Sequence, residues 1–183
     1  MRKLHLVAPL VAFLPLTLSA CSDGAFGTGV PPETVLDEAS EQDLQDLCVA
    51  VSNEMLALVT GPIQRAFCTS VGIRVDSASV SCREARDVCI SNAEPPMVTS
   101  CDNINMAAFD ACDTTVGEAE DCMRQLRANV NRISGQITCS LTPEDLDTID
   151  IGVEDLLPAD CTAIAEECPA LGMLLSFDLD TIE

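Results

Sequence analysis

The chain has 183 residues, with 30 Asp and Glu against 9 Lys and Arg and a formal net charge of −21. An acidic chain of this kind is repelled by nucleic acid and by anionic lipid surfaces, because binding them requires neutralising cations. The single lysine, Lys3, and the single histidine, His5, lie at the extreme N-terminus, and the chain has neither Trp nor Tyr.

Residues 1–20 have the order of a cleaved secretory leader. Arg2 and Lys3 precede an apolar stretch that contains two prolines and ends in small residues. This stretch is shorter than the roughly 20 apolar residues that cross a bilayer comfortably. We therefore predict a signal peptide; a retained membrane helix is the alternative.

The end of this leader, Leu18-Ser19-Ala20-Cys21, resembles the lipobox of bacterial lipoproteins. The resemblance implies cleavage before Cys21, a diacylglyceryl group on its sulfur and acylation of the new amino group. Because Ser22 and not Asp follows the cysteine, the resemblance favours the outer membrane over the inner membrane. We expect an exported protein that is anchored by lipid to the bacterial envelope and faces the periplasm or the cell exterior. An ordinary secretory signal followed by a chance cysteine is the alternative.

Removal of the leader also removes side chains that catalytic sites commonly use. Loss of Arg2 and Lys3 changes the formal charge from −21 to −23, and the remaining chain has no Lys, His or Tyr. Nucleophilic sites that need His, Schiff-base chemistry and a phosphate-binding P-loop are thereby excluded. No pair of carboxylates stands out among the thirty, so we predict no catalytic residue and no cofactor.

Ten cysteines follow Cys21, and an even number in an exported chain indicates a framework of up to five disulfides. No pair has the C-x-x-C spacing of redox, haem or zinc sites, so we predict no metal ligands. The disulfide candidates are Cys48, Cys68, Cys82, Cys89, Cys101, Cys112, Cys122, Cys139, Cys161 and Cys168.

Two cysteine pairs, Cys82 with Cys89 and Cys161 with Cys168, lie seven residues apart in predicted helices. Seven residues of helix rise about 10 Å, whereas the Cα atoms of a disulfide lie within roughly 7 Å. Each of these cysteines should therefore bond to a different neighbouring segment. The spacing leaves the full connectivity open.

Helical periodicity and cap residues predict an all-α, disulfide-rich domain over residues 40–183, with at most one or two very short strands. The Gly- and Pro-containing residues 21–39 are expected to be a flexible, lipid-anchored tether. A first helix should begin at Ser40 and stop at Gly61-Pro62. Pro62 should then open a short helix with an inner face of Ile63, Ala66, Phe67 and Cys68, followed by an extended piece over 73–75.

The clearest predicted helix begins at Thr115, which forms a capping box with Glu118. A narrow apolar stripe follows over about 20 residues. We interpret it as the core helix of a monomer, with a dimeric coiled-coil seam as the alternative. Its members are Val116, Ala119, Met123, Leu126, Val130 and Ile133. Further helices are predicted over 81–92, from Thr142 and over 158–167.

Six acidic residues crowd the segment 144–155, and oxygen-rich clusters suit Ca²⁺. The EF-hand pattern fails, however, because Ile149 occupies a ligand position and Gly152 comes too late. We therefore expect a solvated acidic face, with a cation site as the alternative.

Two further patterns concern the origin of the chain. The sequence between Cys112 and Cys122, with Thr115 to Glu118 at its centre, resembles a pattern in uncharacterised Cys-rich lipoproteins of myxobacteria-like species. It implies no activity. A faint echo, in which Gly and Ile follow Cys48 and Cys122 at equal offsets, suggests that 40–101 and 112–183 descend from one duplicated unit; chance agreement is the alternative.

Together these observations predict a non-catalytic structural or interaction role at the cell envelope. Strong negative charge favours a basic protein partner, and we expect the seven arginines after Cys21 to pair with carboxylates inside the domain. A lipoprotein that binds divalent cations or another small ligand is the second hypothesis. A hydrolase that uses carboxylates alone is the third.

Overall fold

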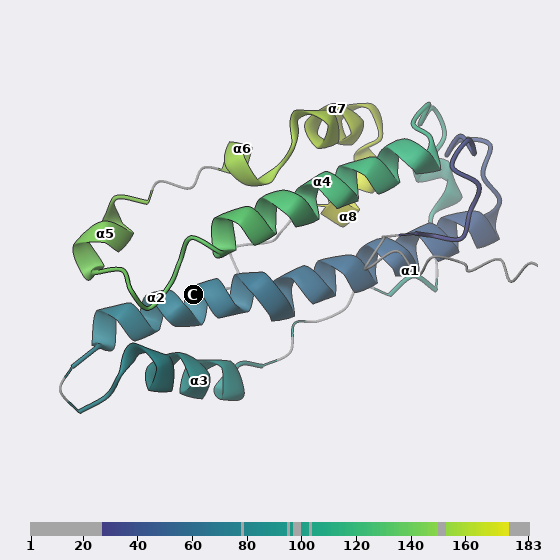
Figure 1. Ribbon diagram of the computed structural model, residues 1–183. Coiled ribbons are helices and arrows are strands. Elements are labelled where there is room, and N and C mark those ends of the chain that lie inside the picture. Colours follow the sequence, from purple (N-terminus) through teal and green to yellow (C-terminus); the bar gives the residue numbers. More distant parts are fainter. Residues whose placement is uncertain are drawn as a thin grey trace, which may run out of the picture.

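The computed structural model describes residues 27–77, 79–94, 96, 100–102, 104–149 and 153–175, without the side chains of 153, 154 and 173–175. These residues form the predicted all-α, disulfide-rich fold. They contain no β-strand, and a single isolated bridge joins Val35 to Thr115. One long helical rod is flanked by α4 on one side and by the shorter α3 on the other (Figure 1).

The elements follow one another along the chain as short helices around two long ones. They are α1 (Glu41–Leu58), the π-helical turn η1 (Val59–Ile63), α2 (Gln64–Val75), α3 (Cys82–Asn92), the 3₁₀ turn η2 (Met106–Ala108), α4 (Val116–Ser134), α5 (Pro143–Asp147), α6 (Val153–Leu156), α7 (Ala159–Glu167) and α8 (Pro169–Leu175).

Helix α1 begins where its sequence predicts. Ser40 is the N-cap, and its side chain and that of Asp43 bond reciprocally to each other's backbone amides. This arrangement satisfies two amides that the first turn of a helix otherwise leaves without acceptors. The apolar stripe that follows, including Leu44, Leu47 and Val51, is buried.

The predicted stop at Gly61-Pro62 is wrong. The backbone stays helical from α1 to α2 through the π turn η1, which contains Pro62. Pro62 has no N–H to donate, and a π turn accommodates such a local gap in the helical bonding pattern. Gly61 also lacks the Cβ that would crowd a following proline ring in helical conformation. The expected extended piece over 73–75 is the last turn of α2.

Helix α4 confirms the clearest prediction. Thr115 caps it and forms the capping box with Glu118. All six members of its apolar stripe are buried within this domain, where α4 contacts α1 and α7. The stripe is therefore part of the core, as the interpretation of a core helix predicts.

The predicted tether is too long. Val30, Leu36 and Ala39 are buried in the core, and the amides of Leu36 and Asp37 donate to the carbonyls of Thr114 and Cys112. These contacts reach across some eighty positions of sequence, so no local pattern announces them. Among the described residues, contacts with the rest of the domain begin at Thr28. Residues 1–26, with the leader and Cys21, lie outside the described residues.

All ten cysteines of the predicted framework are bonded in five bridges. Members of both seven-residue pairs bond to different segments, as predicted, and the Cα–Cα distances run from 4.9 to 5.9 Å. The bridges are Cys48–Cys101, Cys68–Cys89, Cys82–Cys139, Cys112–Cys168 and Cys122–Cys161.

The two halves of the chain have the same pattern of bridges. In each half the first cysteine bonds to the fifth and the second to the fourth, while the third cysteine, Cys82 or Cys139, bonds to its counterpart. This division coincides with the proposed repeat of 40–101 and 112–183. The register differs from that of the sequence echo, which matches Cys48 to Cys122, so the duplication stays a prediction.

Among the described residues, the continuous helix Glu41–Val75 is long and apolar enough to cross a membrane, with a mean hydropathy of 1.2. Core helices of folded domains meet the same criterion. Here the helix carries two bridged cysteines and contacts both α3 and α4, so we interpret it as a core helix. Only 28% of its apolar window is buried, and it therefore leaves apolar side chains at the surface.

Candidate interaction surface

Helices α2 and α3 form an antiparallel hairpin. Cys68 of α2 bonds to Cys89 near the end of α3, with a Cα–Cα distance of 5.5 Å. Gly72, one turn further along α2, lies against the start of α3, where an added Cβ would be 2.5 Å from the carbonyl oxygen of Cys82. Glycine thus permits an approach between the two backbones that any side chain would prevent.

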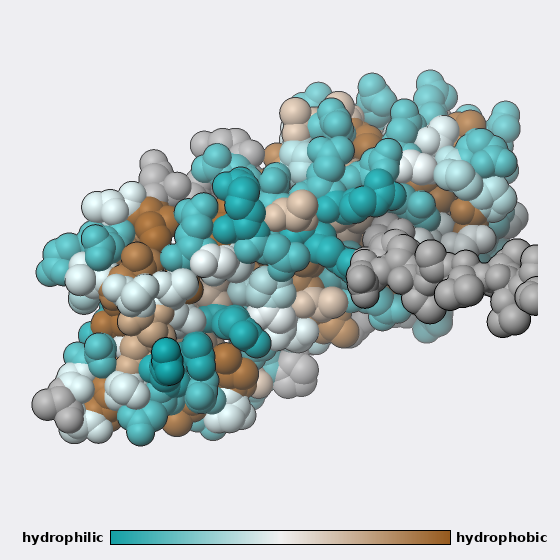
Figure 2. Space-filling view, in the orientation of Figure 1, coloured by the Kyte–Doolittle hydropathy of each residue, from teal (hydrophilic) through white to brown (hydrophobic). Residues whose placement is uncertain are grey.

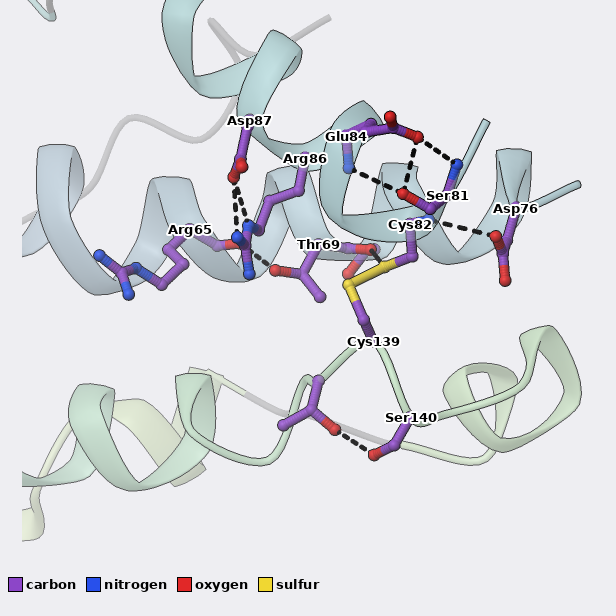
Figure 3. Close-up of a disulfide and its surroundings, with 12 residues drawn as sticks. Arg65, Thr69, Asp76, Ser81, Cys82, Glu84, Arg86, Asp87, Cys139 and Ser140 are labelled. Atoms are coloured by element: carbon purple, nitrogen blue, oxygen red, sulfur yellow. Dashed lines mark hydrogen bonds and ion pairs between the residues drawn. A yellow bond between two sulfur atoms is a disulfide. The ribbon is translucent and has the colours of Figure 1, made fainter. Parts of the chain in front are cut away.

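Polar groups fix the turn between these helices. The carboxylate of Asp76 accepts from the amide of Cys82 at 3.1 Å. Ser81 caps α3 and forms a capping box with Glu84. Cys82 then bonds to Cys139 in the loop after α4, which ties the hairpin to the second half of the chain (Figure 3).

The two most accessible large apolar side chains of the hairpin are Phe67 and Val88, at 55% and 59%; Val75 and Val80 near the turn are also exposed. Phe67 and Val88 each directly precede a cysteine of the Cys68–Cys89 bridge. Successive residues on a helix are rotated by about 100° about its axis. The two bonded cysteines face each other across the antiparallel pair. The residues directly before them therefore project to the same side of the pair. Phe67 and Val88 therefore share one side of the hairpin, which we call the apolar face.

Phe67 was expected in the inner face of its helix, and that expectation is wrong. Ala66 and Cys68 are buried, whereas Phe67 between them projects outward. Three consecutive helical residues span about 200°, so they do not all face one neighbour. This geometry is the signal in the sequence that could have revealed the exposed ring.

Most other exposed side chains among the described residues are polar or charged. Figure 2 shows hydrophilic side chains over most of the visible side of the molecule, with hydrophobic residues in small separate groups. An open depression on α7 is lined by Leu157, Ala159, Thr162, Ala163 and Glu166. Glu166 is the single ionisable group of this lining, so the depression does not assemble the two carboxylates that a hydrolase of this composition requires.

The described residues of the acidic segment 144–155 do not form a cation site. Among the described residues, no group of three or more His, Cys, Asp or Glu side chains is placed to hold a metal ion. Asp145 accepts from the Thr142 amide at the start of α5, and Asp147 pairs with Arg74 at 2.9 Å. Asp150 and the side chain of Glu154 lie outside the described residues.

Among the described carboxylates, three have lowered pKa values, and each belongs to a helix cap. The backbone amide and then the hydroxyl of Ser81 lower the pKa of Glu84 by bonding to its charged form. Thr115 lowers the pKa of Glu118 and Thr142 lowers the pKa of Asp145 in the same way. Perturbed pKa values often mark active sites, but capping explains these three.

No protein family, curated protein or solved structure matches this chain. The class of protein is therefore defined by its own fold, an all-α domain braced by five disulfides.

Proposed function

We propose that this chain is an exported lipoprotein of the bacterial envelope, anchored through Cys21 and favouring the outer membrane. Its role there is that of a non-catalytic interaction module. The leader and lipobox support the location, and five disulfides are typical of oxidising compartments. The resemblance to Cys-rich lipoproteins of myxobacteria-like species belongs to the same proposal.

The apolar face carries the interaction role. Exposed apolar side chains on a braced surface mark contact sites when they gather in one place. Phe67 is one of two phenylalanines among the described residues, and it is 55% accessible while Phe109 is 6% accessible. Aromatic side chains dominate the energy of protein interfaces, so an exposed ring in so aromatic-poor a chain favours a contact.

The position of the anchor limits where this contact occurs. Thr28 is fixed to α4 by two hydrogen bonds to the Glu120 carboxylate. Seven residues separate it from Cys21 and span at most about 25 Å when extended. The domain would therefore stay close to the lipid surface, where its acidic exterior favours a basic protein partner.

Chemical crosslinking in intact cells tests this function. We expect the wild-type chain to give a defined crosslinked adduct, and the double variant Phe67→Ser/Val88→Ser to lose it while remaining membrane-associated. Val49 on α1 is 48% accessible, so Val49→Ser is a matched control that should keep the adduct. An adduct that survives the double variant would contradict the proposed contact.

A further inference from the structure

The α2–α3 hairpin differs in charge from the rest of the chain. Between Gln64 and Asn92 there are four Arg and three Asp or Glu, whereas the whole chain has 30 Asp and Glu against 9 Lys and Arg. The hairpin is thus a slightly cationic element within a strongly anionic protein.

The three carboxylates of the hairpin are occupied locally. Asp76 accepts from the Cys82 amide at 3.1 Å, and Glu84 accepts from the Ser81 amide at 3.0 Å. Asp87 pairs with Arg86 at 2.8 Å. None of the three forms an ion pair with Arg65 or Arg83.

Two of those arginines, Arg65 and Arg83, are exposed and form no ion pair with any described residue. We expected the arginines to pair inside the domain, and Arg74, Arg86, Arg124 and Arg127 do so. Arg132 on α4 is the other arginine after Cys21 that forms no ion pair with a described residue, so two of the three such guanidinium groups belong to this hairpin.

Helix geometry places these groups together. Arg65 lies three residues before Cys68, and Arg86 lies three residues before Cys89, so both project to one side of the antiparallel hairpin. Figure 3 shows Arg65 on α2, and Arg86 beside Asp87 on α3. Arg83 lies about one further turn along α3. This side is opposite the apolar face, and we call Arg65, Arg83 and Arg86 the arginine surface.

We propose that the arginine surface binds a short acidic segment of a protein partner. The proposal deepens the interaction function above, on which it rests, by giving the chemistry of a second contact. Planar guanidinium groups pair with carboxylates in two-pronged geometry. A long polyanion or an anionic bilayer would extend beyond the hairpin over the acidic remainder and be repelled, whereas a short segment touches the hairpin alone.

A hexaglutamate peptide is the probe, added to the ¹⁵N-labelled domain at about 20 mM salt, where exposed charges are weakly screened. We expect amide shifts confined to residues 64–92. Arg65→Gln and Arg83→Gln should each weaken binding by about 1.5- to fivefold, the range of single exposed ion pairs. Arg65→Lys keeps the charge but loses the two-pronged geometry, so it should weaken binding less than Arg65→Gln does.

Arg132→Gln is the matched control, because Arg132 is exposed on α4 and also forms no ion pair with a described residue. It should leave binding almost unchanged. Absence of binding, shifts outside the hairpin, or an equal loss in Arg132→Gln would overturn the proposal. Binding to phosphatidylglycerol vesicles but not to the peptide would also overturn it, in favour of a lipid.

The apolar-face variant separates this inference from the proposed function. Phe67→Ser/Val88→Ser should leave peptide binding unchanged, because those side chains lie on the opposite side of the hairpin. If the wild-type protein binds the peptide but gives no crosslinked adduct in cells, the proposed function alone is contradicted. If it gives the adduct but does not bind the peptide, the arginine surface alone is contradicted.

Discussion

Glu54 of α1 and Arg127 of α4 form a two-pronged ion pair that joins the two longest segments of the fold. The Nε and Nη2 groups of Arg127 donate to the two carboxylate oxygens of Glu54. The Glu54 side chain is 6% accessible and that of Arg127 is 31% accessible. Hydrogen bonding to Glu54 raises the pKa of Arg127, which therefore stays charged.

This difference in burial predicts that replacing Arg127 and replacing Glu54 lower the free energy of unfolding by different amounts. Arg127→Leu strands a carboxylate that cannot reach water and should lower the unfolding free energy by about 3 kcal/mol. Glu54→Leu should cost less, about 1–2 kcal/mol, because Arg127 can turn towards solvent. The double variant should cost less than the sum. Guanidinium unfolding without reductant measures all three, and additive costs would contradict the pairing.

The capping carboxylates predict a specific dependence on pH. The usual values are 4.5 for Glu84 and Glu118 and 3.8 for Asp145, and the folded pKa values lie below them. Between the folded and unfolded values the unfolded chain binds more protons, so unfolding free energy rises with pH. The stabilisation is present above pH 4.5 and is lost as the pH falls through the folded values.

The net charge of the protein also changes between pH 7 and pH 3, which alters stability by itself. The contribution of the caps is therefore measured as the difference in stability between wild type and a variant. The triple variant Glu84→Gln/Glu118→Gln/Asp145→Asn keeps neutral acceptors at the caps. Its stability deficit against wild type should be largest near pH 7 and shrink as the pH falls below 4.5 through the folded pKa values. Glu166→Gln removes an exposed carboxylate of α7 outside any cap and serves as the control. A deficit that does not shrink below pH 4.5 would count against the caps.

The position of the Cys82–Cys139 bridge predicts how much stability is lost when the link between the two halves is removed. Of the five bridges among the described residues, it alone joins them, across 57 positions of sequence. Its removal in Cys82→Ala/Cys139→Ala should lower stability by about 4 kcal/mol, against about 3 kcal/mol for Cys68→Ala/Cys89→Ala, whose loop spans 21 positions. Thermal unfolding without reductant should show this order, and the opposite order would refute it.

The lipid anchor predicts a change of fractionation. Cys21→Ser removes the sulfur that the lipobox resemblance marks for modification, so the protein should leave the membrane fraction for the soluble one. Metabolic labelling with a fatty acid should be lost in the same variant. Ser22→Ala, a neighbouring change, should affect neither readout. Unchanged fractionation of Cys21→Ser would refute lipidation.

Local signals predicted much of the helical framework. The capping boxes at Ser40 and Thr115 and the stripe of α4 depend on residues three or four apart, so the sequence displays them directly. The same holds for the rule that Cys82 does not bond to Cys89. These features determine the fold class without any knowledge of distant contacts.

Features set by distant contacts could not be predicted in this way. The packing of Leu36 beside Thr114, the pairing of Glu54 with Arg127 and the choice of Cys139 as the partner of Cys82 join remote segments. The continuation of the helix through Pro62 depends on a π turn that overrides a usual stop signal.

The most direct test of an interaction module on the hairpin is site-specific photocrosslinking in intact cells. A benzophenone side chain is introduced separately at positions 67, 88 and 49, and the adducts are compared after irradiation. The account predicts one common adduct from positions 67 and 88 and none from position 49. No adduct from the two hairpin positions, or the same adduct from all three, would contradict it.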